Sequence, residues 1–346
     1  MRIMIRATNW VGDAIMALPA LRAVRKRFPD AQIALVARPS VADLYRDQRI
    51  CDELIPYDSQ GVHRGWRGHA VMAAHLRSRK FDVALLLQNA FDAAWLAWRA
   101  GIPSRIGYGR DGRSLLLTNA VAVPRPGEIP GHEKFYYLEL LRRAGWIDRL
   151  ENDEHISLRV PDEQKNRAMQ KLVEAGARPQ TLRIAVGAGA SYGSAKCWPP
   201  HRFAGALNDF RAQFDADLVL FGTAQEVPVS AAIARHLRYP YVDLTGRTSV
   251  AELPSLLSEC HLFLGNDSGA MHVAAAVGLP VVAVFGPTDP LGTAPVTPRV
   301  TIVQHKPYCS PCFLRRCPTD HRCMLAVRPE TVADALRLQF SALGAS

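Results

Sequence analysis

The sequence contains no apolar run close to the roughly 20 residues that a membrane-spanning helix needs. Its first residues lack the pattern of a secretory signal peptide and alternate as a strand does. It has 7 cysteines, and in a chain expected to be cytoplasmic these are thiols or metal ligands rather than disulfides. These absences predict a cytoplasmic protein that touches a membrane only through its surface charge.

The composition predicts two globular domains and acidic partners. A chain of 346 residues exceeds one average domain, and its 48% apolar content supports a sizeable core. The formal net charge of +10 and the isoelectric point near 9.5 favour nucleotides, phosphorylated glycolipid, an anionic membrane surface or nucleic acid. The alternative is a basic surface that is solvated and binds no polyanion.

Apolar runs alternate with helical patterns through most of the chain, which is typical of a doubly wound α/β fold. In the first half, strands are predicted at 2–7, 32–37 and 81–87, and helices at 14–28, 64–80 and 132–146. In the second half, strands are predicted at 182–186, 217–221, 241–244, 261–264 and 281–285, with 300–303 as a candidate edge strand, and helices at 200–214, 227–237 and 250–260.

The character of the chain changes after residue 150, where we expect the junction between the domains. An acidic cluster is followed by a polar helix at 162–175 and by a short linker at 177–180. This pattern predicts a first domain over residues 1–175 and a second over residues 181–328, with a cleft between two similar α/β halves. A last helix covers residues 329–346.

A strand, a tight turn and a helix at 261–277 predict a site for an anion. Ser268 is a good N-cap, and the small residues around Gly269 leave the first helical N–H groups open to a ligand. These groups and the helix dipole favour a phosphate, and His272 lies one turn further along. Asp267 would cap the helix or accept hydrogen bonds from ligand hydroxyls. The alternative is an ordinary capped core helix with a satisfied histidine.

Asp13 follows the first predicted strand, at the edge of the sheet where ligands bind in folds of this kind. Facing a cleft there, it could act as a general base on a hydroxyl group. Alternatively, it caps a helix that begins at Ala14, which is the commoner role of an aspartate in that position. Gly12 would keep the approach to it open.

The glycine-rich stretch at 187–193 does not fit a dinucleotide-binding loop, because its third glycine is one residue late and the expected acid is missing. Lys196, just beyond it, can neutralise a diphosphate and assist its departure, or can be an ordinary surface lysine. At the next strand end, Thr223 and Glu226 could hold a ribose and a base. A glutamate that only starts a helix is the alternative for Glu226.

A cysteine-rich segment near the C-terminus could bind a structural zinc ion in a tetrahedral site. Its spacing is too short for a two-knuckle zinc ribbon, and free thiols are the equal alternative. The candidate ligands are Cys309, Cys312, Cys317 and Cys323, with His305 and His321 in reserve.

Several of these stretches resemble the ADP-heptose:lipopolysaccharide heptosyltransferases of glycosyltransferase family 9, and among them heptosyltransferase II. The resemblance implies a GT-B fold of two Rossmann-like domains, with a last helix that returns to the first domain. It also implies inverting transfer of L-glycero-D-manno-heptose from ADP-heptose to heptosyl-Kdo2-lipid A. The matching runs are Asn9-Trp10-Val11-Gly12-Asp13-Ala14, Ala195-Lys196 with Trp198-Pro199, Asn266 to His272, and Phe285-Gly286-Pro287-Thr288.

The resemblance assigns roles to the matching positions. Asp13 is the implied base, beside an acceptor-side loop of Asn9, Trp10 and Gly12, and Lys196 stabilises the departing diphosphate. The implied partners are ADP-heptose, the Kdo-lipid A acceptor and the anionic cytoplasmic face of the inner membrane, with no nucleic acid and no cofactor for catalysis. The implied donor contacts are Thr223, Glu226, Asp267, Ser268, Gly269, Ala270, Met271 and His272.

Other functions are less well supported. Heptosyltransferase I or another nucleotide-sugar transferase is the nearest alternative. A nicotinamide-dependent oxidoreductase is disfavoured by the missing acid after the glycine-rich stretch. A non-catalytic polyanion-binding protein is disfavoured because Asp13 and Lys196 are both present, in two separate domains.

Overall fold

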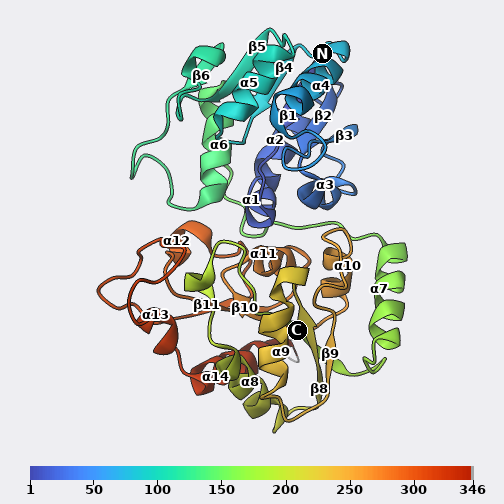
Figure 1. The fold of residues 1–346 in the computed structure, drawn as a ribbon, viewed down its shortest axis with the longest axis vertical. Coiled ribbons are helices and arrows are strands. Elements are labelled where there is room, and N and C mark those ends of the chain that lie inside the picture. The colour runs from blue at the N-terminus through green and yellow to red at the C-terminus, as the bar shows by residue number, and fades with distance from the viewer. Residues whose placement is uncertain (344–346) are drawn as a thin grey trace. The chain divides into compact units, whose positions relative to one another are not determined.

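The computed structural model describes residues 1–343 and divides the chain into two compact units, Met1–Asp153 and Glu154–Ser346 (Figure 1). Each unit contains one six-stranded parallel sheet with helices between the strands. The predicted two-domain, doubly wound α/β architecture is therefore confirmed. Among residues 1–343, no helix combines the length and apolar content that crossing a membrane requires.

The sheet of the first unit has the strand order β3-β2-β1-β4-β5-β6. The chain moves outward from β1 to β3 and then returns to the other side of β1, so the switch in direction lies between β1 and β4. Ligands bind at such switch points, beyond the carboxyl ends of the strands. The strands are β1 (Arg2–Arg6), β2 (Gln32–Ala37), β3 (Glu53–Pro56), β4 (Val83–Leu86), β5 (Ser104–Tyr108) and β6 (Asn119–Val121).

The helix predicted at 14–28 is in fact two helices that meet at Ala17. Pro19 lies in the first turn of the second helix, where its missing N–H is tolerated. The helices of this unit are α1 (Val11–Met16), α2 (Leu18–Arg27), α3 (Pro39–Tyr45), α4 (Gly65–Ser78), α5 (Phe91–Arg99), the 3-10 turn η1 (Ser114–Leu116) and α6 (Glu133–Arg143).

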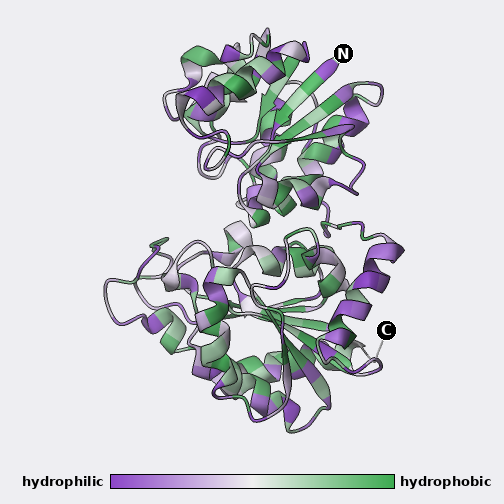
Figure 2. Cartoon of the chain, turned by 45° about the vertical axis from the view of Figure 1, so that its right-hand side comes forward, coloured by the Kyte–Doolittle hydropathy of each residue, from purple (hydrophilic) through white to green (hydrophobic). Residues whose placement is uncertain are grey.

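The sheet of the second unit has the order β12-β11-β10-β7-β8-β9, with its switch point between β7 and β10. The central strands are mostly hydrophobic, as expected for a sheet covered on both faces (Figure 2). Every strand predicted for this half is present. The strands are β7 (Leu182–Gly187), β8 (Ala216–Phe221), β9 (Tyr241–Asp243), β10 (Leu262–Asn266), β11 (Val281–Phe285) and β12 (Val300–Gln304).

Helices and 3-10 turns connect these strands and complete the second unit. They are α7 (Asp162–Glu174), η2 (Ser194–Lys196), α8 (Pro200–Arg211), η3 (Ala224–Glu226), α9 (Val227–Ala234), α10 (Leu253–Ser258), α11 (Gly269–Ala276), α12 (Pro290–Thr293), α13 (Arg322–Leu325) and α14 (Pro329–Leu343).

The boundary between the units precedes α7, so the predicted first domain of residues 1–175 is too long. Helix α7 packs against α10, and Lys171 Nζ donates to Glu252 Oε1 at 2.6 Å. Before α7, Leu158 N donates to Ala276 O at 2.7 Å. These contacts join residues 154–175 to the second unit, although their polar sequence suggests a connection between domains.

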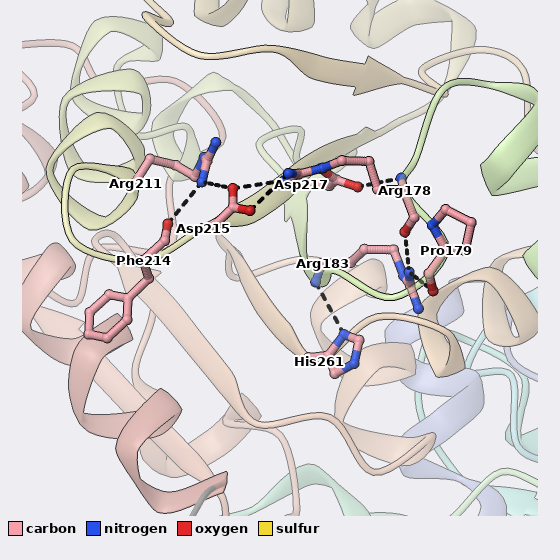
Figure 3. Close-up of polar contacts among 8 residues, drawn as sticks. All are labelled: Arg178, Pro179, Arg183, Arg211, Phe214, Asp215, Asp217 and His261. Atoms are coloured by element: carbon pink, nitrogen blue, oxygen red, sulfur yellow. Dashed lines mark hydrogen bonds and ion pairs between the residues drawn. The ribbon is translucent and has the colours of Figure 1, made fainter.

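The predicted linker at 177–180 is also held in the second unit (Figure 3). Arg178 forms ion pairs of 2.8 Å with Asp215 and with Asp217, and Arg211 binds the same Asp215 at 2.7 Å. The Arg183 guanidinium donates to Arg178 O at 3.0 Å. The segment is thus a fixed lead into β7.

The last helix packs on the second unit, whereas the resemblance implies a helix that returns to the first domain. Helix α14 packs on α8 and on the sheet of the second unit, where Val332 and Leu336 are fully buried in the core. The Phe340 and Phe214 rings meet edge to face, with their centroids 4.8 Å apart. The predicted helix ran to residue 346, and its residues 344–346 lie outside the described part of the chain.

Candidate functional site

The start of α11 has the capped form predicted for an anion site. Ser268 is the N-cap, and its Oγ accepts from Met271 N at 3.5 Å. Ser268, Gly269 and Ala270 are partly exposed, whereas Met271 is fully buried. The N–H groups of the first turn therefore remain available to an anion. Met271 is a packing residue, because its side chain lies in the core and its N–H is already bonded.

His272 is 4% exposed, so it belongs to the core side of α11 and already has an interaction partner. Gly265 lies inside β10, not in the turn after it. A side chain at Gly265 would meet the Phe263 ring at 2.6 Å. Packing within the sheet thus explains this glycine. The residues that leave room for a ligand at the start of α11 are Ser268 and Gly269.

Lys196 and Asp267 form a buried ion pair beside the start of α11. Lys196 Nζ donates to Asp267 Oδ2 at 2.5 Å, and Thr288 Oγ1 donates to the same oxygen at 2.6 Å. Lys196 is 9% exposed, and the other two residues are 5% exposed. Asp267 therefore anchors Lys196, and Ser268 rather than Asp267 is the N-cap of α11. An ammonium group has three donors, so Lys196 can still bind a phosphate oxygen.

Asn266 fixes the loop that carries Lys196. Its side-chain amide donates to Ala188 O at 2.6 Å, and its Oδ1 accepts from Trp198 N at 3.0 Å. The residue is fully buried at the end of β10. The sequence placed Asn266 in the motif but gave it no role. Its role is to tie both sides of the Lys196 loop to the strand that leads into α11.

The cysteine-rich segment supports the same loop from the other side. Ala195 N donates to Arg315 O at 3.1 Å, and the Tyr192 hydroxyl donates to Phe313 O at 2.5 Å. The Tyr192 ring lies 4.7 Å from Lys196 Nζ, a favourable position for a cation. A side chain at Gly193 would overlap with Arg315 O. The segment is thus a scaffold for the position of Lys196.

The four cysteines of this segment are the candidate ligands for the predicted structural zinc, which stays a prediction. Within residues 1–343, no group of three or more His, Cys, Asp or Glu side chains is placed to hold an ion. Cys309 is exposed and Cys323 is buried, with Cys312 and Cys317 between these extremes. His321, a reserve ligand in the sequence, has its Nε2 2.7 Å from Ala195 O.

A small pocket lies at the carboxyl ends of β7 and β8 in the second unit. Thr223 and Glu226 form a capping box at its rim, in which Thr223 N donates to Glu226 Oε2 at 2.7 Å. A side chain at Gly189 would overlap with the Glu226 carboxylate and would displace it from its present position. The pocket is lined by Val186, Ala188, Gly189, Leu220, Phe221, Glu226, Val229, Ser230, Ile233 and Thr245.

Sequence reasoning missed two hydroxyl groups on the wall of this pocket. Thr245 Oγ1 donates to Ser230 Oγ at 2.9 Å, and Ser230 Oγ donates to Asp243 Oδ1 at 3.2 Å. These residues come from α9 and from the end of β9. The only available signal was a Thr-Gly pair after a strand, which is too common to identify a site.

In the first unit, Asp13 lies within the first turn of α1. The helix begins at Val11 with Trp10 as its N-cap, three residues earlier than predicted, so Asp13 does not cap it. Asn9, just before, accepts from the buried Arg6 guanidinium at 2.9 Å. Arg6 in turn lies over the Tyr57 ring at 5.2 Å. These contacts fix the loop after β1, in which Trp10 is 51% exposed.

The carboxyl group of Glu133 is close enough to Asp13 for its pKa to respond to the Asp13 charge. Burial, followed by the negative charge of Asp13, raises the pKa of Glu133 to about 7, and Arg110 opposes this shift. Glu133 is the first residue of α6. The sequence did not single it out, because nothing local distinguishes it from an acid at a helix start. A carboxyl group with a raised pKa beside a second carboxyl group is a frequent feature of acid–base sites.

Glu133→Gln is expected to change how stability depends on pH. A glutamate with a pKa of about 4.5 when unfolded and about 7 when folded binds more protons in the folded state, so the free energy of unfolding falls as pH rises through that interval. The variant should gain melting temperature relative to the unmodified protein at pH 8 but not at pH 4. The exposed Asp148→Asn is a matched control in the same unit. Equal pH profiles for both variants would contradict the shift.

Comparison with known proteins agrees with this geometry. The profile of glycosyltransferase family 9 (heptosyltransferase) matches residues 70–322. The chain is 28% identical to the lipopolysaccharide heptosyltransferase 2 of Salmonella typhimurium and 27% identical to the lipooligosaccharide heptosyltransferase 2 of Haemophilus influenzae. In both cases the match covers 88% of this chain and 88% of the relative.

The fold is similar to that of solved heptosyltransferases. The structure of the ADP-heptose lipopolysaccharide heptosyltransferase II of Escherichia coli superimposes with a TM-score of 0.83, covering 99% of this chain and 100% of that one at 24% identity. The two parallel sheets are thus those of a GT-B protein. Because the family profile spans most of the chain, this protein belongs to glycosyltransferase family 9, the heptosyltransferases.

Proposed function

We propose that the chain transfers L-glycero-D-manno-heptose from ADP-heptose to the lipopolysaccharide inner core, adding the second heptose to heptosyl-Kdo2-lipid A. The observation that carries the proposal is the buried Lys196–Asp267–Thr288 arrangement at the open start of α11. It offers a fixed ammonium group and free backbone N–H groups to a diphosphate. The similarity to two enzymes named heptosyltransferase 2 supports the choice of sugar and acceptor.

The donor binds the second unit in this proposal. The diphosphate lies at Ser268, Gly269 and Ala270, within reach of Lys196. The nucleoside lies at the carboxyl ends of β7 and β8, over the small pocket whose wall combines apolar side chains with the polar groups of Glu226, Ser230 and Thr245. Such a mixture of an apolar wall with a few polar groups suits a purine nucleoside.

The acceptor binds the first unit, with its hydroxyl group at Asp13. Asp13 removes the proton as the hydroxyl oxygen attacks the anomeric carbon of heptose, and the bond from that carbon to the diphosphate oxygen breaks on the opposite side. The anomeric configuration is therefore inverted. The charge that develops on the departing ADP is stabilised by Lys196 and by the N–H groups of α11.

The test of the proposed function is turnover of ADP-heptose on defined acceptors. Transfer is expected onto heptosyl-Kdo2-lipid A and not onto Kdo2-lipid A, which is the substrate that would indicate heptosyltransferase I. Calorimetry with ADP, UDP, GDP and NAD should give the tightest binding for ADP. A preference for NAD, or the absence of any transfer by a protein that binds ADP, would overturn the proposal.

Transfer is also expected to persist in EDTA, because Lys196 and the start of α11 already supply positive charge to the diphosphate and the sequence has no Asp-x-Asp motif at a strand end near them. The measurement is the initial rate with and without chelator, followed by addition of Mg²⁺. Zinc content and a thermal melt on the same sample separate slow unfolding from loss of chemistry. A prompt loss of activity that Mg²⁺ restores would contradict the expectation.

We place the reaction at the cytoplasmic face of the inner membrane, where a lipid-anchored acceptor would be presented, with no nucleic acid as partner. The net charge of +10 supports attraction to an anionic bilayer.

A further inference from the structure

The outer faces of α4 and α5 in the first unit carry exposed aromatic and basic side chains together. Both helices cover the same face of the sheet, since Met72 and Leu76 of α4 and Ala94 and Leu96 of α5 belong to one core cluster. They contact each other along their length (Figure 1). At one end, His69 Nδ1 lies 2.9 Å from Asp92 Oδ1, and at the other, Arg77 donates to Arg99 O at 2.5 Å.

The apolar side chains of this surface are unusually exposed for their type. Trp66 is 75% exposed, Val62 is 81% and Val71 is 65%. On the neighbouring helix, Phe91 is 51% exposed and Trp98 is 48%. Scattered exposed apolar residues need no explanation, but a set concentrated on α5, on α4 and on the loop before α4 marks an interaction surface.

The basic side chains around them are not explained by the stability of the helix. Arg64 precedes α4 and Arg67 lies in its first turn, where a positive charge opposes the helix dipole. Neither residue is in an ion pair within the described part of the chain, and no acid lies in the sequence between residues 59 and 81. The nearby Asp92 is engaged by His69 and by the Tyr57 hydroxyl. The surface is therefore strongly positive.

We propose that this α4–α5 surface, made by Val62, Arg64, Trp66, Arg67, Val71, Phe91, Trp98 and Arg99, binds the surface of an anionic phospholipid bilayer. Tryptophan side chains prefer the level of the lipid headgroups, and arginines there pair with lipid phosphates. The Arg67 guanidinium lies over the Trp66 ring at 5.2 Å, which lets the pair enter such a layer together.

Other occupants match the surface less well. A symmetric contact with a second copy would bring arginines against the same arginines, and like charges in an interface oppose association. A nucleic acid would satisfy the arginines but would leave the aliphatic Val62 and Val71 without an apolar partner. A bilayer satisfies both, because apolar side chains enter the headgroup boundary while the charges remain outside.

Bilayer binding rests on the proposed function in one respect: it would bring the enzyme close to an acceptor that is anchored in the lipid. The surface includes the N-terminal ends of α4 and α5, which follow β3 and β4 at the carboxyl edge of the sheet. The loop after β1 with Asp13 lies at the same edge. Binding through this surface would hold that edge close to the membrane.

The test is sedimentation of the full chain with vesicles of phosphatidylcholine alone and of phosphatidylcholine mixed with phosphatidylglycerol. Binding is expected for the mixed vesicles only, and it should weaken as salt is added. Arg64→Glu/Arg67→Glu should reduce partitioning by on the order of 30-fold or more, the effect of removing two basic charges near such a surface. Trp66→Ser should also reduce it, and the fluorescence change of the tryptophans on vesicle addition should diminish.

Matched controls are Arg235→Glu/Arg238→Glu, an exposed basic pair of the second unit, and Leu115→Ser, an exposed apolar residue of the first. Unchanged binding in the α4–α5 variants, binding lost equally in the controls, or preferential binding of an RNA oligomer would overturn the inference. A dimer in sedimentation velocity that the Trp66 variant dissociates would also overturn it.

Transfer to a delipidated, water-soluble acceptor separates the two proposals. The transfer rate should be normal in the α4–α5 variants. Absence of transfer by the unmodified protein would refute only the proposed function.

Discussion

Replacing Asp13 by asparagine is expected to lower the single-turnover rate of heptose transfer by roughly 10²- to 10⁴-fold, the usual contribution of a general base. Asparagine has the same shape but cannot accept the proton of the acceptor hydroxyl. ADP affinity should hardly change, because the proposed donor contacts all belong to the second unit. The measurements are the single-turnover rate, ADP affinity by calorimetry and the melting temperature on one preparation.

Stability provides the control for this variant. Because α1 begins at Val11 and Trp10 is its N-cap, Asp13 does not hold the helix start through a capping bond, and its replacement should leave α1 folded. Removing the charge of Asp13 should also lower the pKa of Glu133, because that charge is one of the causes that raise it. The pH interval over which stability falls should therefore narrow. A near-normal rate in a folded protein would leave Asp13 without a catalytic role.

The sheets were predictable because each strand is a short apolar run bounded by turn residues. The run at Val281–Phe285 is an example: every residue is buried, and nothing but a strand covered on both faces accounts for it. The start of α11 was equally clear, because Ser268 and the glycine after it are local signals for a helix N-terminus.

Errors arose where a distant contact outweighs local sequence. Helix α7 is polar enough to be a connection, yet Lys171 reaches Glu252 and binds it to the second unit. The last helix was assigned to the first domain by resemblance, but Val332 and Leu336 complete the core of the second. The early start of α1 is an error of another kind, since Asp13 looks like an N-cap and Trp10 does not.

The residues of the candidate site were identified more reliably than their contacts. Lys196 and Asp267 were both named, but as separate contacts to a ligand, and they are 71 positions apart in the sequence. Their ion pair depends on the neighbouring positions of β7 and β10 in the sheet, which the chain order does not reveal. Glu133 and Thr245 were missed for the same reason, because the role of each depends on a residue distant in the sequence: Asp13 for Glu133 and Ser230 for Thr245.

Lys196→Met is expected to weaken ADP binding by about 10- to 100-fold, the worth of a charged hydrogen bond to the diphosphate. Transfer should slow as well, since the departing diphosphate loses its fixed cation. The buried partner complicates this experiment. Removing Lys196 leaves Asp267, which is 5% exposed, without its counter-ion, and such a change typically costs about 3–5 kcal/mol of stability. Weaker ADP binding could then reflect a disturbed fold.

The double variant Lys196→Met/Asp267→Asn separates the two effects. In the unmodified protein, Thr288 Oγ1 donates to Asp267 Oδ2 at 2.6 Å. An asparagine at position 267 can still accept this hydrogen bond, and no charge remains buried in the double variant. Its melting temperature should therefore recover toward that of the unmodified protein. ADP affinity and the transfer rate should stay low, because the ammonium group is still missing. If ADP affinity recovered together with stability, Lys196 would be a structural partner of Asp267, and the diphosphate would be bound by the N–H groups of α11 alone.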